Sequence, residues 1–188
     1  MTVGGKPRVA VIGASGIGKH HANWWTLEGA QVCAIVGTSR ESLQKAADGL
    51  RKLFPFDGET FTDLSAMLRE VRPDIVDVCS PPALHAAHVS EALEHGCHVL
   101  CEKPFVYDPR LTTKECRRTA QALVELAATR GRSLALCIQY FEAGSILKAM
   151  WEAAHPDEPI RHMHAHLAAP AKGRPPHPEA AGRRAGVF

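Results

Sequence analysis

The sequence predicts a doubly wound α/β domain, a Rossmann-type fold with a parallel sheet, followed by a fragment of a second α/β domain. Strand-like apolar runs alternate with stretches of helical period along most of the chain. The runs show little apolar-polar alternation, as expected when helices cover both faces of a parallel sheet. A glycine-rich turn also joins the first run to the first helix. The clearest runs are VAVI (9–12), CAIV (33–36), DIVDVC (74–79) and LALCI (134–138).

The first half of the pattern is a βαβ unit. We expect a strand over 8–13, a helix from about Ile17, a strand over 30–37 and a helix over 42–54. A loop rich in proline and glycine follows.

The second half repeats this alternation. Asp63 is the expected N-cap of a short helix, and Gly96 and Gly131 are the expected C-caps of two longer ones. In order, the expected helices cover 63–71, 81–95 and 111–130, and the expected strands cover 74–80, 97–102 and 134–140.

The composition changes sharply towards the C-terminus. We expect a helix over Glu142–Ala154 and a strand over Ile160–Leu167, and then a stretch rich in Pro, Gly, Ala and Arg that should be largely disordered. The predicted organisation is a dinucleotide-binding domain over 1–140, the start of a truncated substrate or oligomerisation domain over 141–168, and a disordered tail over 169–188.

The composition is that of an ordinary globular protein that binds small molecules. Apolar residues make up 45% and charged residues 22% of the chain, with a net charge of +2. The basic residues form no face typical of a nucleic-acid or membrane partner. No apolar run approaches the roughly 20 residues of a membrane span, and the polar N-terminus is too short for a secretory signal, which predicts a cytoplasmic protein. The six cysteines are interpreted as small, reduced hydrophobic residues.

The turn after the first strand predicts a dinucleotide site. Gly13 and Gly18 fill the outer positions of a GxGxxG fingerprint, Ser15 occupies the central position, and Gly16 follows directly and can supply the missing room. Ile17 then begins the helix, whose N-terminus favours a pyrophosphate. The alternative is a structural turn without a ligand.

The end of the second predicted strand favours NADP over NAD, with NAD as the alternative. An NAD enzyme usually has an acidic residue there to bind the ribose 2′-hydroxyl, but this chain reads Gly37, Thr38, Ser39, Arg40. Hydroxyl groups and a guanidinium suit a 2′-phosphate better. The alternative is that Arg40 is a solvated residue at the helix start and Glu41 reaches the ribose.

The segment DIVDVCSPPALHAAHVSEALEHGCHVLCEKPF resembles the most characteristic part of the Gfo/Idh/MocA oxidoreductase family. The resemblance runs from Arg8 to about Tyr140 and rests on the glycine turn, SPPxxH and EKPF in that order. It implies an N-terminal Rossmann domain, a second α/β domain whose sheet packs in homo-oligomers, and substrates that are sugars, polyols or related hydroxy compounds.

The resemblance also implies roles for individual residues. Ser80, Pro81 and His85 would lie along the cofactor, and Glu102 and Lys103 would lie near the nicotinamide.

Lys103 is the expected catalytic residue. By the resemblance, Pro104 follows a cis peptide bond, which would aim Lys103 into the active site. Hydride transfer from a carbinol leaves a proton on oxygen, and an ammonium group there stabilises the developing negative charge. The alternative roles for Lys103 are an ion pair with Glu102 or a surface charge.

The sequence departs from the family pattern after Gln139. The Asp and His pair that the family's second domain supplies has no counterpart there, which predicts a truncated second domain. The leading hypothesis is an NADP-dependent oxidoreductase, and the rival is a dinucleotide-binding module or remnant without turnover.

The remaining histidines are not expected to bind metal. His162, His164 and His166 alternate on a predicted strand and share one face, but no acidic or thiol partner accompanies them, so a polar face is favoured over a metal site. His20 and His21 are interpreted as packing and solvent residues of the first helix.

Overall fold

The computed structural model describes residues 5–161. The chain divides into two compact units between Phe141 and Glu142. The predicted strand over Ile160–Leu167 is not formed by residues 160 and 161, and its remainder lies outside the described residues. The three alternating histidines and the predicted tail also lie outside the described residues. Within the second unit the structure describes one helix followed by irregular chain.

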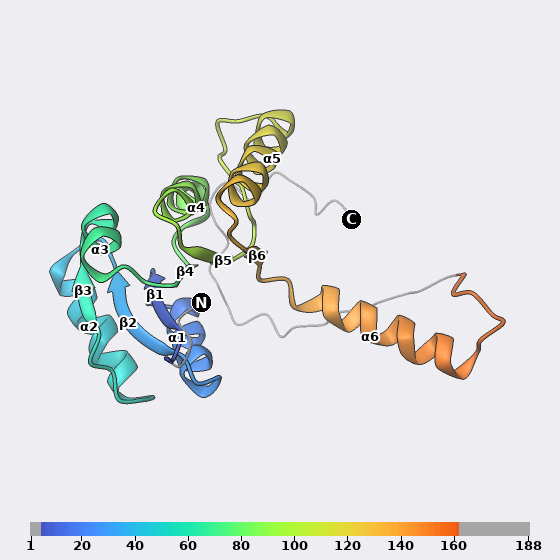
Figure 1. Cartoon of the computed structure of the whole chain (residues 1–188), viewed down its shortest axis with the longest axis horizontal. Coiled ribbons are helices and arrows are strands. Elements are labelled where there is room, and N and C mark those ends of the chain that lie inside the picture. The colour runs from blue at the N-terminus through green and yellow to red at the C-terminus, as the bar shows by residue number, and fades with distance from the viewer. Residues whose placement is uncertain (1–4, 162–188) are drawn as a thin grey trace, which may run out of the picture. The chain divides into compact units, whose positions relative to one another are not determined.

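The first unit is built on a six-stranded parallel sheet (Figure 1), which confirms the predicted fold class. The strand order is β3-β2-β1-β4-β5-β6, so the chain builds outwards from β1 in both directions. The strands are β1 (Arg8–Ile12), β2 (Gln31–Val36), β3 (Glu59–Phe61), β4 (Ile75–Val78), β5 (His98–Cys101) and β6 (Leu134–Leu136).

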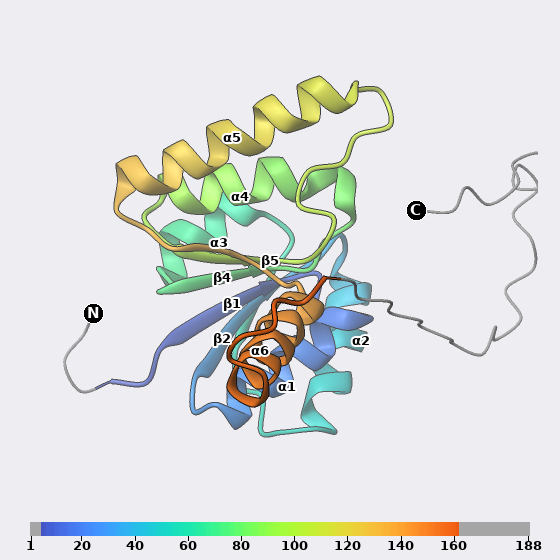
Figure 2. The same cartoon turned by 90° about the vertical axis from the view of Figure 1, so that its right-hand side faces the viewer.

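Helices cover both faces of the sheet. In Figure 2, α3, α4 and α5 lie on one side of the strands and α1 and α2 on the other. Two apolar clusters match these layers: one packs α3, α4 and α5 against the sheet, and the other packs α1 and α2. The helices are α1 (Ile17–Leu27), α2 (Arg40–Arg51), α3 (Leu64–Val71), α4 (His85–Glu94), α5 (Thr113–Arg130) and α6 (Gln139–Ala154).

The central strands are buried on both faces, which explains their unbroken apolar sequence. Val9, Ala10 and Val11 of β1 are inaccessible to solvent, as are Val76 and Val78 of β4. Burial of each of these valine side chains contributes about 1.5–3 kcal/mol. The sheet therefore provides a rigid scaffold for the loops that follow its strands.

Three of the helices begin with a side-chain cap. Ser39 and Thr112 each form a capping box, at the start of α2 and α5, and Asp63 caps α3 as predicted. The helices α1 and α4 have no side-chain cap.

The sequence prediction missed one strand and misplaced several boundaries. The edge strand β3 was not predicted, because its sequence is short and polar. The helix expected from Pro81 begins as a 3-10 turn, η1 (Pro82–Leu84), and the α-helix starts only at His85. Finally, β6 ends at Leu136 and α6 begins at Gln139, both earlier than expected.

Candidate functional site

The strand order reverses between β1 and β4, which places a candidate site at the carboxyl ends of these strands. The chain passes from β1 to β2 on one side and returns to β4 on the other. In open parallel sheets, ligands bind in the crevice outside the carboxyl ends at this reversal point. The predicted glycine turn, SPPxxH and EKPF segments directly follow β1, β4 and β5, so the fold brings them to one edge.

The glycine turn is packed so tightly that two of its positions exclude a side chain. Gly13 has φ +84°, and a Cβ there would lie 2.7 Å from the Cys79 carbonyl oxygen. A Cβ on Gly18 would collide with the Gly13 carbonyl oxygen. These glycines let α1 start directly against the ends of β1 and β4.

The first turn of α1 is open to a ligand. Its N-cap is Gly16, which has no side chain to cap the helix, and no acidic residue lies in the first turn. A Cβ at Gly16 would meet no atom within 4 Å, and Ser15 and Ile17 are exposed. Bare backbone N–H groups and the positive end of the helix dipole therefore face solvent, which is the arrangement that binds a pyrophosphate.

The residues after β2 offer cationic and hydroxyl groups. Ser39 uses its hydroxyl to cap α2, accepting from the Ser42 amide at 3.1 Å. Arg40 is exposed and forms no ion pair within the described residues, and Thr38 is also exposed. Glu41 is paired with Lys45 at 2.7 Å. The guanidinium of Arg40 is thus available to an anionic ligand at this end of the site.

His85 holds two loops together. Its Nδ1 lies 2.8 Å from the Pro104 carbonyl oxygen and its Nε2 lies 2.7 Å from the Ser80 carbonyl oxygen, and the ring is fully buried. The ring therefore lies between the backbone that follows β4 and the backbone that follows β5. The Ser80 hydroxyl is engaged with His88 Nδ1 at 2.9 Å, while Pro81 is exposed.

Lys103 is exposed at the end of β5, and its peptide bond to Pro104 is cis, as the resemblance implied. The ion pair between Lys103 and Glu102, considered above, is not formed. The Glu102 Oε2 atom instead accepts the Lys103 backbone N–H at 3.0 Å, and the Glu102 carboxylate is buried. The ammonium group of Lys103 is therefore available to a ligand.

A buried polar network lies beneath these segments. His21 Nδ1 lies 3.0 and 3.2 Å from the two carboxylate oxygens of Asp77, and its Nε2 lies 3.3 Å from Oε1 of Glu102. Trp25 donates its indole N–H to Asp77 at 2.6 Å. All three ionisable groups are nearly inaccessible to solvent.

The network changes the ionisation of its members. The hydrogen bond to Asp77 raises the pKa of His21 above its ordinary value, helped by the charges of Asp77 and Glu102 and opposed by burial. Burial, followed by the charge of Asp77, raises the pKa of the Cys79 thiol. Burial and Glu102 raise the pKa of the Cys137 thiol. The network thus favours the protonated form of the His21 ring and the neutral form of both thiols.

Sequence reasoning missed the role of His21. It predicted a packing or solvent residue, whereas the structure places His21 between two carboxylates. Asp77 carried the available signal, because an acidic residue inside the apolar strand IVDV needs a buried partner. The identity of that partner, 56 residues away along the chain, had no signal.

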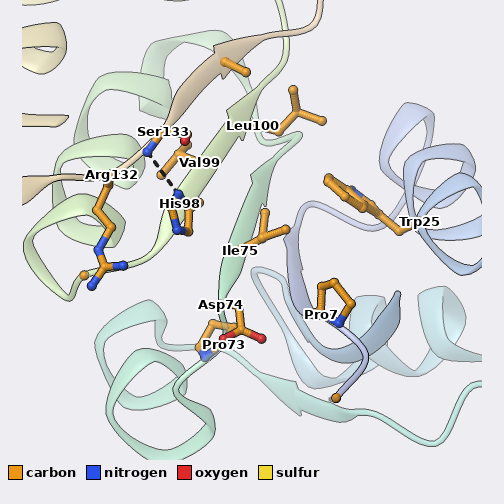
Figure 3. A pocket seen from close by; sticks show the side chains of 13 residues that line it. Pro7, Trp25, Pro73, Asp74, Ile75, His98, Val99, Leu100, Arg132 and Ser133 are labelled. Atoms are coloured by element: carbon orange, nitrogen blue, oxygen red, sulfur yellow. Dashed lines mark hydrogen bonds between the residues drawn. The ribbon is translucent and has the colours of Figure 1, made fainter. Parts of the chain in front are cut away.

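A hollow of about 690 Å³ lies at the opposite edge of the sheet (Figure 3). It is lined by Ile75 and His98 at the amino-terminal ends of β4 and β5, by Leu100 further along β5, and by Trp25 from α1. His98 Nδ1 accepts the Ser133 amide at 3.0 Å beside it. Because dinucleotides bind at the carboxyl edge, this hollow is separate from the candidate site.

The family is identified by a sequence profile that covers the whole sheet. Residues 7–136 match the Gfo/Idh/MocA oxidoreductase family with an NAD-binding Rossmann fold. This chain belongs to that family. Within residues 5–161, no helix is both long enough and apolar enough to span a membrane.

The relatives that the chain matches include dehydrogenases named for a glucoside, a UDP-sugar and inositol. The chain is 37% identical to D-glucoside 3-dehydrogenase of Escherichia coli over 123 residues, which are 64% of this chain and 33% of that protein. It therefore spans about a third of the length of this relative.

Two solved structures show both forms of the cofactor. A 3-ketoreductase from Actinomadura kijaniata, in complex with TDP-benzene and NADP, superposes with a TM-score of 0.63 at 27% identity, over 79% of this chain and 44% of that one. The WlbA dehydrogenase from Thermus thermophilus, in complex with NAD and alpha-ketoglutarate, gives a TM-score of 0.62 at 25% identity, over 81% and 48%.

Proposed function

We propose that this chain binds a nicotinamide dinucleotide and functions as an oxidoreductase on a sugar, polyol or related hydroxy compound. The observation that carries the proposal is the uncapped first turn of α1, which lies at the reversal of the strand order behind Gly13 and Gly18. The membership of the family supports the same assignment. When bound, the cofactor would accept or donate the hydride.

We assign the pyrophosphate to the first turn of α1, with Gly13, Ser15, Gly16, Ile17 and Gly18 around it. Backbone N–H groups there meet a doubly charged group without an opposing carboxylate in the first turn. Ser80, Pro81 and His85 would border the cofactor after β4, with His85 acting through its two carbonyl bonds.

We further propose NADP as the preferred cofactor. Arg40 has no ionic partner within the described residues, the exposed Thr38 adds a hydroxyl group, and the nearby Glu41 is paired with Lys45. Ser39 lies between Thr38 and Arg40, and its hydroxyl caps α2. A guanidinium recognises a 2′-phosphate, whereas a free ribose hydroxyl is better bound by a carboxylate.

Lys103 is the proposed catalytic residue. Its ammonium group is exposed and free of an ion pair with Glu102, so it can hydrogen-bond the substrate oxygen. In the oxidation of a carbinol, the hydroxyl proton would pass to water as the hydride leaves the carbon, and the Lys103 ammonium would stabilise the negative charge that develops on the oxygen.

A second candidate is a dinucleotide-binding module without turnover. It is favoured by one observation: the uncapped first turn of α1 can hold a pyrophosphate without any contribution from Lys103.

The shared claim is tested by titrating NADPH and NADH into the purified chain and following cofactor fluorescence. We expect tighter binding of NADPH than NADH, and the absence of binding by either below millimolar concentrations would refute both candidates. A screen for NADP reduction with sugars and polyols then separates them. Turnover that is lost in Lys103→Ala supports the oxidoreductase, while a chain that binds NADPH and turns over no hydroxy compound supports the module.

A further inference from the structure

The segment Glu102–Pro104 is held in place at two points. At one end, the Pro104 carbonyl oxygen accepts from His85 at 2.8 Å. At the other end, the Glu102 carboxylate lies between His21 Nε2, at 3.3 Å, and the Lys103 backbone N–H, at 3.0 Å. We propose that His21 is a positioning residue, which fixes the Glu102 carboxylate and through it holds Lys103 at the nicotinamide end of the cofactor site.

The charges around His21 favour a doubly protonated ring. Asp77 faces Nδ1 and Glu102 faces Nε2, and carboxylates only accept hydrogen bonds. An imidazolium donates on both sides and balances one of the two buried negative charges. The other titratable groups facing the ring are Cys79 after β4, 3.4 Å from Nδ1, and Cys137 after β6, 3.9 Å from Nε2.

Asp77 fixes the position of His21 itself. It occupies the middle of β4, is inaccessible to solvent, and accepts from both Trp25 and His21. Because β4 is a central strand, this anchor cannot move without disturbing the sheet. A continuous path of hydrogen bonds and charges therefore leads from the sheet through His21 to Glu102.

The two oxygens of Glu102 have separate tasks. Oε1 faces His21, while Oε2 accepts the backbone N–H of Lys103. Without His21, Glu102 would be a buried carboxylate with its main cationic partner removed, so it would reorient toward solvent or take up a proton. Either change weakens the acceptor for the Lys103 amide and releases the segment on the side that His85 does not hold.

This inference rests on the proposed cofactor site, and the experiment separates the two. The variants His21→Gln, Glu102→Gln and their double combination are titrated with NADPH and with 2′-phospho-ADP-ribose, which lacks the nicotinamide. His20→Gln is the matched control, because His20 is the exposed neighbour of His21 on the same helix.

We expect each single variant to weaken NADPH binding about five- to tenfold, with the double variant no weaker than the worse single one, because coupled groups are not additive. Binding of 2′-phospho-ADP-ribose should change less than about twofold, since its site is built from other residues. Equal losses for both ligands, additive losses in the double variant, or unchanged NADPH binding would overturn the role of His21. Failure of the unmodified chain to bind either ligand would instead refute the cofactor site.

A measurement on the unmodified chain guards against variants that fail to fold. The ¹⁵N resonances of the His21 ring, assigned by through-bond correlation from the backbone, should show that both ring nitrogens carry hydrogen at pH 6.5. A neutral ring with a single tautomer at that pH would contradict the bridge between Asp77 and Glu102.

Discussion

The glycine turn at 13–18 and the segment at 102–104 lie at the same edge of one sheet, but they are built by different means. The turn is made almost entirely of backbone, held by a positive φ at Gly13 and by close contact between Gly18 and Gly13. The segment 102–104 is positioned by buried side chains from α1 and α4.

This difference determines how each region responds to change. At Gly13 and Gly18 the turn tolerates no added atom, because the nearest neighbouring groups are main chain and cannot rotate away. A side-chain site depends on the protonation of its members and changes gradually with charge and pH. We therefore expect substitutions in the turn to act through shape and those around His21 to act through electrostatics.

The largest effect is expected from Gly18→Val. The new side chain would collide with the Gly13 carbonyl oxygen, so α1 must move away from β1. We expect a loss of about 3 kcal/mol in the free energy of unfolding, measured by urea denaturation, and loss of NADPH binding. The matched control is Gly49→Ala in α2, whose Cβ would meet only a Lys19 side-chain carbon at 3.8 Å. That control should stabilise the chain by about 0.5–1 kcal/mol.

A smaller loss is expected from Asp77→Asn, which keeps the shape of the side chain and removes its charge. Hydrogen bonds to charged groups are worth about 1.5–3 kcal/mol, and the loss in unfolding free energy should fall in that range. Asp48→Asn is the control, since the partners of Asp48, Arg51 and Gln44, are both exposed, and it should change stability by less than about 0.5 kcal/mol. Equal effects of the two substitutions would show that the buried network does not stabilise the fold.

Arg40→Gln should alter cofactor choice without altering the fold. Removing the guanidinium should weaken NADPH binding about tenfold, equivalent to about 1.4 kcal/mol, and leave NADH binding nearly unchanged. Parallel fluorescence titrations with the two cofactors measure the ratio. If both affinities fell together, Arg40 would not be the residue that reads the 2′-phosphate.

The smallest expected effect is a dependence of stability on pH. The pKa of His21 is raised in the folded chain, so its stabilising contribution is complete below the unfolded value of about 6.5 and is lost as pH rises through the folded pKa. One proton changes the unfolding free energy by at most about 1.4 kcal/mol per pH unit. Urea denaturation between pH 6 and 9 should show this decline, and His21→Gln should remove most of it. Identical pH profiles for the unmodified chain and His21→Gln would show that groups other than His21 cause the decline.

Much of the fold was predictable because its signals are local. The apolar strands, the cap at Asp63 and the C-cap at Gly131 depend on neighbouring residues, and all were confirmed. The strand β3 was missed because its residues Glu59–Phe61 gain their strand geometry only by pairing with β2. The starts of α4 and α6 were misplaced for a similar reason, since turn geometry sets them more than periodicity does.

The sequence by itself determined the sheet, the glycine turn, and the presence of Lys103 beside a cis proline, because these follow from short-range patterns and a family-specific segment. Only the tertiary structure decided which buried groups meet. His21 and Asp77 are 56 residues apart, and their encounter depends on α1 packing across the end of β4. Charges buried at long sequence separation leave no periodic pattern, so the network that supports Glu102 became visible only once the chain was folded.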